Sequence, residues 1–523
     1  MRTALPPLLV GLVTALFAVI VAVFVWQPGL ASFADDSVSY LVMAQVFSPW
    51  QAASPPVAEA FAREAFYPPL YPLLLALAGV AQDIARAQVV TALLLAACLP
   101  LMYLLGTRWL GDKWAAAGAA AVTALLPSLW IHVKGTLSEP LFALVLLATL
   151  LLVEVEQDRQ KGRWPLALAM IALVLTRTVG VIVVAAYAAC ALVRRDRPLG
   201  RALLPVLTAL AAYGAWVLLR PAQTTDINMG IALEHARTLS AEALAGILAR
   251  QANSIAEAWT GALLLFWVEG RPVRVALAGA VGVLALTGMA LRFVARKPDA
   301  WMSAAYLATF LVWPFQDQMT RFLFPALPVL VLYAFWVVTV GLRRLGRTGA
   351  PAQALLAVLI ASLAAPGLAF VHQRAQAEGP YVEMTDWYRR PDLDDARRRA
   401  AVHLDLLADM EAIRALTMPE DRVMWVAPSY IALLARRHGV AAPPAGLAPA
   451  AYRVAVDEAA PDYVFLSVYH PRDTIHDTAW QAGMRALGGY GQVVHARTRP
   501  DGSASSVLIR LRPKEAAQWR ASR

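Results

Sequence analysis

The chain has 523 residues, of which 59% are hydrophobic and 16% are charged, and its formal net charge is +10. Its mean hydropathy is +0.55, whereas soluble proteins are about 45–50% apolar and about 25% charged. This composition excludes an ordinary soluble domain, a disordered chain and a nucleic-acid-binding module. The two cysteines, Cys98 and Cys190, lie in apolar runs, so the sequence offers no disulfide framework and no CxxC-type metal site.

Long apolar runs predict an all-α polytopic membrane domain. A helix rises about 1.5 Å per residue, so about 20 apolar residues cross a hydrocarbon core of about 30 Å. We interpret the first run as a retained helix, because it exceeds the roughly 7–15 apolar residues of a signal peptide. About eleven runs are predicted to span the membrane, some of them short: 5–26, 87–105, 114–131, 140–153, 165–175, 179–192, 203–219, 273–291, 301–313, 322–340 and 351–370.

Basic residues are concentrated in alternate loops. With the N-terminus in the cytoplasm, the positive-inside rule is satisfied, because nearly all short basic clusters then lie on the cytoplasmic side. This pattern explains much of the net charge without nucleic acid, and it predicts a multi-pass protein of the cytoplasmic (inner) membrane. The clusters are Arg108/Lys113, Arg159/Lys161/Arg163, Arg194/Arg195/Arg197/Arg201, Arg292/Arg296/Lys297 and Arg343/Arg344/Arg347.

The outer side holds the long polar segments, namely loops 27–86 and 220–272 and the tail 372–523, which follows a membrane domain of residues 1–371. In the tail, Val402, Leu406, Met410, Ile413 and Leu416 share one face at helical spacing. Short segments rich in β-branched and aromatic residues predict strands at 423–426, 463–468, 492–496 and 506–511, with helical segments at 431–437 and 479–487. These elements predict a small extracytoplasmic α/β domain.

The first outer loop carries candidate catalytic groups. Asp35 and Asp36 lie just beyond the first membrane helix, and Tyr40 follows Asp36 by one helical turn. A carboxylate at this position can act as a general base or hold a divalent cation; alternatively, it caps the helix. Tyr67 and Tyr71 follow in a proline-punctuated, leucine-rich segment, which is also typical of an interfacial anchor.

Further charged residues lie at other outer boundaries. Glu139 opens the fourth apolar run and is either a second acidic group converging with Asp36 or a helix cap, and Lys134 lies in the turn before it. Arg177 and Arg321 are predicted on the outer side, where basic residues are otherwise rare. The guanidinium group of arginine is suited to bind a lipid phosphate through two hydrogen bonds. The alternatives are snorkelling to the headgroups and, for Arg321, an ion pair with Asp317.

Several common catalytic motifs are missing from the sequence. We find no P-loop, HExxH, GxSxG or EF-hand pattern, and the eight histidines show no convincing metal-ligand spacing. No sequence motif therefore supports a function as an ATP-driven protein or a zinc hydrolase.

The ordered motifs resemble those of GT-C membrane glycosyltransferases, in particular the bacterial relatives of protein O-mannosyltransferases and the lipid A aminoarabinose transferases. The resemblance covers about residues 1–345. At Ser37 the chain differs from the aminoarabinose transferases, which have an acidic residue there. The matching motifs are DSVSY at 36–40, YPPLYP at 67–72, SEPLF at 138–142, and Arg321-Phe322 with Pro325 and Pro328.

This resemblance implies an inverting transfer of sugar from a polyprenyl-phosphate donor to a glycan, lipid or protein acceptor outside the cytoplasm. It implies Asp36 as general base, with Asp35 as the alternative register, and Glu139 as the second acidic residue. An oxocarbenium-like transition state and a lipid-phosphate leaving group require fixed cations, for which Arg321, Arg177 and Lys134 are the candidates. Tyr40, Tyr67 and Tyr71 are expected to contact substrate. Any divalent cation would be held by Asp35 and Asp36.

Three other readings stay open at this point. A transporter or flippase would place charges deep in its spans or show an internal repeat, and we detect few such charges and no repeat. An oligosaccharide polymerase or ligase would use a diphosphate-linked donor. An inactive scaffold would only display the α/β tail.

Overall fold

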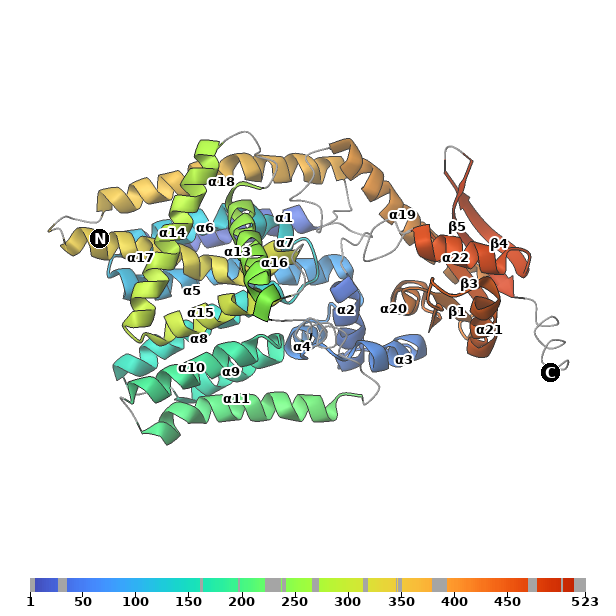
Figure 1. The fold of residues 1–523 in the computed structure, drawn as a ribbon, viewed down its shortest axis with the longest axis horizontal. Helices are drawn as coiled ribbons and strands as arrows, with labels where there is room; N and C mark the ends of the chain where they lie inside the picture. The colour runs from blue at the N-terminus through green and yellow to red at the C-terminus, as the bar shows by residue number, and fades with distance from the viewer. Residues whose placement is uncertain are drawn as a thin grey trace.

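The computed structural model describes residues 5–26, 35–159, 163–195, 198–221, 237, 241–265, 272–313, 318–344, 346, 350–378, 393–468, 477–499 and 502–511. Most of the chain is a bundle of helices, and a small sheet domain lies at one end of it (Figure 1).

The helices follow the apolar runs closely. Two of the predicted runs are interrupted in the structure. The run at 114–131 is split into α6 and α7. The run at 322–340 is divided among α16, a 3₁₀ turn (η2) and α17. The bundle contains α1 (Leu5–Val25), α5 (Ile84–Leu110), α6 (Lys113–Ala124), α7 (Pro127–His132), α8 (Glu139–Arg159), α9 (Arg163–Thr176), α10 (Gly180–Arg194), α11 (Leu199–Leu219), α13 (Ala241–Leu264), α14 (Pro272–Val294), α15 (Pro298–Phe310), α16 (Met319–Leu323), η2 (Phe324–Ala326), α17 (Leu327–Arg344) and α18 (Ala350–Glu378).

The break between α6 and α7 corrects the prediction of one span at 114–131. Leu126 has an extended backbone, with φ −65° and ψ 123°, and Pro127 begins the next helix. The residue before a proline disfavours the α conformation, and proline itself is well tolerated in a first helical turn. Apolar composition alone does not reveal this break.

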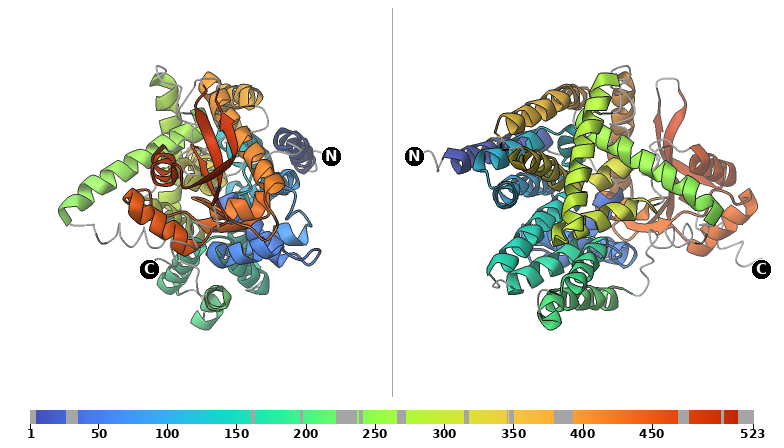
Figure 2. Two further views of the ribbon diagram at one scale, coloured as in Figure 1. Left: turned by 90° about the vertical axis from the view of Figure 1, so that its right-hand side faces the viewer. Right: turned by 60° about the vertical axis from the view of Figure 1, so that its left-hand side comes forward.

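Six described helices are long and apolar enough to cross a membrane: Leu5–Val25, Ile84–Leu110, Ala202–Leu219, Pro272–Val294, Met319–Arg344 and Ala350–Gln376. Two shorter apolar helices are Trp164–Thr176 and Gly180–Arg194. The chain is therefore a multi-pass membrane protein. The count of about eleven crossings stays a prediction. Not every apolar helix is parallel to its neighbours: α14 runs across α17 and α18 rather than along them (Figures 1 and 2).

Basic loops predicted to share one side of the membrane meet at one end of the bundle. Arg343 donates from Nη2 to the Leu110 carbonyl at 2.7 Å, which joins the end of α17 to the end of α5. Arg194 donates from Nη1 to the Arg296 carbonyl at 3.4 Å. The clustering agrees with the charge pattern, while the compartment that this end faces stays a prediction.

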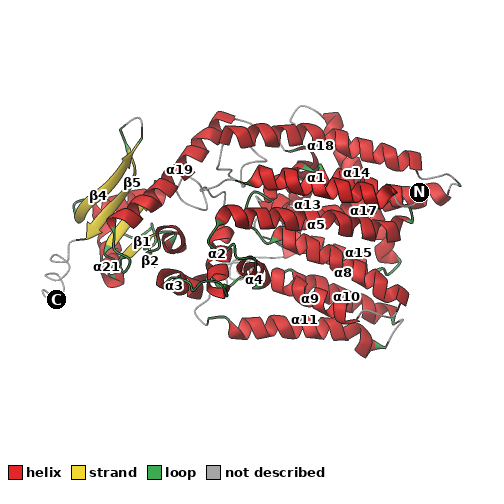
Figure 3. Cartoon of the chain, turned by 180° about the vertical axis from the view of Figure 1, so that it is seen from behind, coloured by secondary structure: helices red, strands yellow, loops and turns green. Residues whose placement is uncertain are grey.

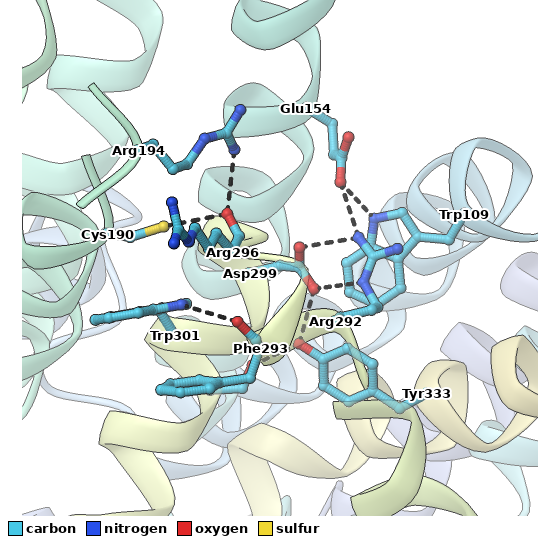
Figure 4. A network of polar contacts seen from close by, with 11 residues as sticks. Trp109, Glu154, Cys190, Arg194, Arg292, Phe293, Arg296, Asp299, Trp301 and Tyr333 are labelled. Carbon is cyan, nitrogen blue, oxygen red and sulfur yellow. Dashed lines mark hydrogen bonds and ion pairs between the residues drawn. The ribbon is translucent and has the colours of Figure 1, made fainter. Parts of the chain in front are cut away.

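A buried polar network near the basic end ties the helices together (Figure 4). Arg292 of α14 donates to both oxygens of Asp299 in α15, at 2.8 and 2.9 Å, and to Glu154 of α8 at 3.1 Å. Its guanidinium carbon lies 4.2 Å from the centroid of the Trp109 ring. Tyr333 of α17 donates to Asp299 at 2.9 Å. Because every charge here has a partner of opposite sign or a ring, this network can exist away from water.

Polar segments expected on the outer side contain helices of their own. The first loop, 27–86, holds α2 (Asp35–Phe47), α3 (Pro55–Glu64) and α4 (Leu70–Leu77). The second, 220–272, holds the 24-residue helix α13, which the sequence reading treated as loop. In Figure 1, α2, α3 and α4 lie between the bundle and the sheet domain.

The C-terminal part is a five-stranded mixed sheet with strand order β2-β1-β3-β5-β4. β1 pairs in parallel with β2 and β3, and β5 pairs antiparallel with β3 and β4. The expected α/β character of this region is confirmed. Its elements are α19 (Leu393–Leu416), β1 (Arg422–Trp425), α20 (Pro428–Tyr430), η3 (Ile431–Ala435), β2 (His438–Ala441), α21 (Pro449–Ala459), β3 (Tyr463–Ser467), α22 (Asp477–Leu487), β4 (Gly491–Thr498) and β5 (Ala504–Leu511).

The predicted apolar face of α19 is largely confirmed. Leu406, Met410 and Ile413 are buried, whereas Leu416 is 47% exposed, and the side chain of Val402 lies outside the described residues. The sequence reading missed β2 and α21. The proposed division of the chain after residue 371 stays a prediction, and α18 continues past that point to Glu378.

One hydrophobic core joins the first outer loop to the sheet domain. Tyr40 and Tyr71 from the loop helices share it with Met410, Trp425 and Phe465. Figure 3 shows the same arrangement from behind, with α2 and α3 between the bundle and the strands. The sheet domain is therefore docked on the helix that carries Asp36.

Candidate active site

The Asp36 carboxylate lies where α2 meets the loop that follows α3. Its Oδ1 accepts a hydrogen bond from the Tyr67 hydroxyl at 2.5 Å. Its Oδ2 forms an ion pair with Nη2 of Arg321 in α16. The Asp36 side chain is 23% exposed, so the carboxylate is both held in place and within reach of a substrate.

Glu139 is the buried centre of the same cluster. It is the first residue of α8, and its Oε1 accepts from Arg321 Nε at 2.5 Å and from Arg177 Nη1 at 2.7 Å. Its side chain is only 1% exposed. One guanidinium, that of Arg321, thus bridges two carboxylates, and the four side chains Asp36, Glu139, Arg177 and Arg321 carry two charges of each sign.

Three tyrosines pack beneath this cluster. Tyr40 hydrogen-bonds the Ser138 hydroxyl at 2.8 Å, and Arg177 donates to that same hydroxyl at 3.1 Å. The Tyr40 ring lies 4.8 Å from the Tyr67 ring and 5.0 Å from the Tyr71 ring, centroid to centroid. Tyr71 is tied in turn to Thr91 of α5, at 2.6 Å. The tyrosines connect α2 to the segment that follows α3, to α5 and to the turn before α8.

Burial and the neighbouring charges together set the protonation states of Tyr67 and Arg177. Burial raises the pKa of the Tyr67 hydroxyl well above its usual value, and the Asp36 carboxylate beside it raises that pKa further. Tyr67 is therefore a neutral donor to Asp36 at physiological pH. For Arg177, burial alone would lower the pKa, but the adjacent Glu139 carboxylate outweighs it and the pKa is raised. Arg177 therefore stays cationic.

Asp36 by itself does not offer a divalent-metal site. Among the described residues there is no cluster of three His, Cys, Asp or Glu side chains that could hold one. Both oxygens of Asp36 are engaged by Tyr67 and Arg321, and the fixed guanidinium groups repel a cation. The Asp35 side chain, the other expected ligand, lies outside the described residues.

Lys134 is placed differently from the two arginines. Its Nζ lies 4.6 Å from the centroid of the Phe24 ring, and its carbonyl accepts from Gln88 at 2.7 Å. The side chain is buried, and none of the contacts that join Asp36, Glu139, Arg177 and Arg321 includes it. Asp317, the alternative partner considered for Arg321, lies outside the described residues.

No protein-family model and no curated protein matches the sequence. Solved structures do match its fold. ArnT from Cupriavidus metallidurans bound to undecaprenyl phosphate has a TM-score of 0.56 and 15% identity, over 94% of this chain and 97% of ArnT. The archaeal oligosaccharyltransferase AglB from Archaeoglobus fulgidus, in complex with an inhibitory peptide and a dolichol-phosphate, has a TM-score of 0.52 and 15% identity, over 94% of this chain and 74% of AglB. Both are GT-C membrane glycosyltransferases. The chain has the GT-C fold.

The resemblance seen in the sequence predicted a GT-C fold, and at the level of fold that prediction is confirmed. Within this GT-C fold the structure brings together Asp36, Glu139, Arg177 and Arg321, which are separated by up to 285 positions in the chain. Their assigned roles stay proposals. The sequence analysis named Ser138 only as part of the SEPLF motif and gave it no role, whereas its hydroxyl contacts both Tyr40 and Arg177.

Proposed function

We propose that the chain transfers a sugar from a polyprenyl-phosphate donor to a hydroxyl of an acceptor outside the cytoplasm. The observation that carries this proposal is the chain of contacts Asp36–Arg321–Glu139–Arg177, which places a reachable carboxylate beside two cations that are only 12% and 17% exposed. The likeness to ArnT bound to undecaprenyl phosphate and to AglB with a dolichol-phosphate supports a lipid phosphate as the group these cations receive.

In the proposed reaction Asp36 acts as general base. It takes the proton of the acceptor hydroxyl while the hydroxyl oxygen bonds to the anomeric carbon of the sugar. The bond from that carbon to the phosphate oxygen breaks, and its electron pair leaves on the polyprenyl phosphate. The products are the glycosylated acceptor and free polyprenyl phosphate, and this displacement inverts the anomeric centre.

Arg321 and Arg177 would stabilise the charge that develops on the leaving phosphate. Each presents N–H donors that Glu139 holds in place, and preorganised donors of this kind usually make the largest single contribution to catalysis. Glu139 holds both guanidinium groups through one oxygen and so sets their separation. In the resting protein Arg321 also holds Asp36; a donor phosphate that takes over its Nη2 would leave Asp36 Oδ2 open to the acceptor proton.

We place the site on the extracytoplasmic face of the cytoplasmic membrane, with the N-terminus inside and the sheet domain outside. The gathering of basic loops at the opposite end supports this orientation. The donor's lipid tail would lie in the bilayer beside the helices, and a glycan, lipid or protein acceptor would approach from the sheet domain. Of the three tyrosines, Tyr67 is half-buried and would line this substrate site, whereas Tyr40 and Tyr71 are buried in the core and would support it from beneath.

A diphosphate-linked oligosaccharide donor is the second candidate, because AglB, an oligosaccharyltransferase, has the same fold. A donor panel separates the two. Purified wild-type protein in nanodiscs is offered polyprenyl-monophosphate sugars and polyprenyl-diphosphate oligosaccharides, and released lipid phosphate is measured. We expect release of monophosphate only. Release of lipid diphosphate alone would favour the second candidate, and uptake into vesicles without bond formation would favour a transporter.

A further inference from the structure

Glu64 connects three elements through one carboxylate. It is the last residue of α3, and its Oε2 accepts from the Ser39 hydroxyl in α2 while its Oε1 accepts from the Ser429 hydroxyl in α20. Ser39 is 4% exposed and Ser429 is 5% exposed, so both hydroxyls are shielded from water. Hydrogen bonds to a carboxylate are stronger than those between neutral groups, above all where water is excluded.

Ser39 belongs to the helix that carries the candidate base. It follows Asp36 by three residues and therefore lies beside it on the surface of α2. It directly precedes Tyr40, whose hydroxyl reaches Ser138. A restraint on Ser39 thus fixes the rotation of α2 about its axis, and with it the direction in which the Asp36 carboxylate points.

On the other side, Ser429 is part of a rigid region of the sheet domain. A Cβ added at Gly439 of β2 would collide with the Pro428 carbonyl oxygen, so the backbones of α20 and β2 pack directly against each other. Residues of α2, α4, α19, β1 and β3 also share one hydrophobic core. The Ser429 hydroxyl is therefore a fixed point of the sheet domain and not the tip of a mobile loop.

We infer that Glu64 is a positioning residue through which the C-terminal sheet domain holds α2, and with it the Asp36 carboxylate, in its place beside Arg321. The role in turnover rests on the function proposed above for Asp36. The coupling itself is a property of the folded chain and is measurable without turnover. It gives the sheet domain a part in the chemistry beyond any contact with acceptor.

Hydrogen exchange of the full-length protein in nanodiscs tests the coupling. We expect about tenfold faster exchange of the α2 amides in Glu64→Ala, the factor that corresponds to one lost hydrogen bond to a charged group. Ser429→Ala should also accelerate exchange in α2, although it changes a residue 390 positions away from Ser39. Glu64→Gln should exchange much closer to wild type than Glu64→Ala does, because its amide donates to one serine hydroxyl while its oxygen accepts from the other, although both bonds are weaker without the charge.

Glu59→Gln is the matched control. Glu59 lies in the same helix and also contacts the sheet domain, through His438 at 2.7 Å, but none of its described hydrogen bonds or ion pairs involves α2. Unchanged α2 exchange in both Glu64→Ala and Ser429→Ala would overturn the inference. So would acceleration in Glu64→Ala alone, because the sheet domain would then not act through Glu64. If Glu64→Ala does not fold, Ser429→Ala decides alone.

Measurements of turnover provide the second test of the role of Glu64. With a lipid-linked donor that the wild type uses, Glu64→Ala should lower kcat about tenfold or more with little change in the donor KM, and Glu64→Gln should restore it. Loss confined to KM would contradict the positioning role. If the wild type turns over no donor, the proposed function fails, and the exchange result still decides whether Glu64 couples the domain to α2.

Discussion

At the scale of single residues, the site depends on the shape of one guanidinium group. Arg321 uses Nε for Glu139 and Nη2 for Asp36, so two edges of one planar group hold two carboxylates. A lysine ammonium carries the same charge but cannot present this fork. The site should therefore be more sensitive to a change of geometry at this position than to a change of net charge.

We predict that Arg321→Lys lowers donor turnover by about a hundredfold, the cost of losing one well-placed donor in a site that stabilises developing charge. Released polyprenyl phosphate is the measurement. Arg86→Lys is the control, because Arg86 is exposed and pairs only with Asp83 among the contacts described. Equal turnover of Arg321→Lys and wild type would mean that Arg321 contributes no more than its charge.

Sequence reasoning at this scale found the groups but not their partners. Asp36, Glu139, Arg177 and Arg321 each stand out locally, as charges at the edges of apolar runs. No local sequence pattern predicts that one arginine bridges two of these carboxylates, because the three residues are far apart in the chain. Glu64 was overlooked for the same reason, since its two partners lie 25 and 365 positions away.

At the scale of elements, the packing of α14 on α17 depends on close backbone approach. A Cβ added at Gly288 would lie 2.4 Å from the Tyr333 carbonyl oxygen, whereas one added at Gly279 of the same helix meets nothing within 4 Å. Tyr333 also donates to Asp299 in the buried network around Arg292 (Figure 4). A shift at this crossing would disturb both contacts.

We predict opposite effects for the same substitution at these two positions. Gly288→Ala should lower the free energy of unfolding by about 1–3 kcal/mol through overpacking. Gly279→Ala should leave it unchanged or raise it by up to about 1 kcal/mol, because alanine is the better helix former. Thermal unfolding of the two variants side by side is the measurement. Similar melting temperatures would refute the close crossing of α14 and α17.

The sequence analysis missed elements that are short or that lack a clear hydrophobic pattern. β2 is only four residues long and contains a glycine, and α13 alternates apolar and polar residues in a region read as loop. The long apolar helices and strands β1, β3 and β5 were found because burial on both sides leaves a continuous apolar run. Breaks within such runs, as between α6 and α7, depend on a single proline.

At the scale of the whole molecule, the contact between the sheet domain and α3 depends on pH. Burial acts to raise the pKa of Glu59, but the hydrogen bond from His438 and the nearby cations outweigh it, so the pKa lies below its usual value of 4.5. A carboxyl whose pKa is lower in the folded protein stabilises the fold above its unfolded pKa. That stabilisation is lost as the pH falls through the folded value.

We therefore predict that wild type melts at a slightly higher temperature than Glu59→Gln at pH 7, and that the difference disappears as the pH is lowered beyond 4.5. The difference should be small, because Glu59 is 47% exposed and such pairs contribute about 1 kcal/mol or less. Melting curves from pH 7 downward are the measurement, with the exposed Glu458→Gln as control. A difference that grows on acidification would reverse the assigned sign.

The most direct test of the proposed enzyme is the release of free polyprenyl phosphate from a donor by wild type, Asp36→Asn, Asp35→Asn and the exposed control Asp394→Asn, all shown to be folded. An asparagine can keep hydrogen bonds to Tyr67 and Arg321 but is a poor base. We predict that Asp36→Asn loses about a hundredfold or more of the release, within the range expected for general-base catalysis. The other two variants should stay near wild type. Release by Asp36→Asn at the wild-type rate would contradict the account.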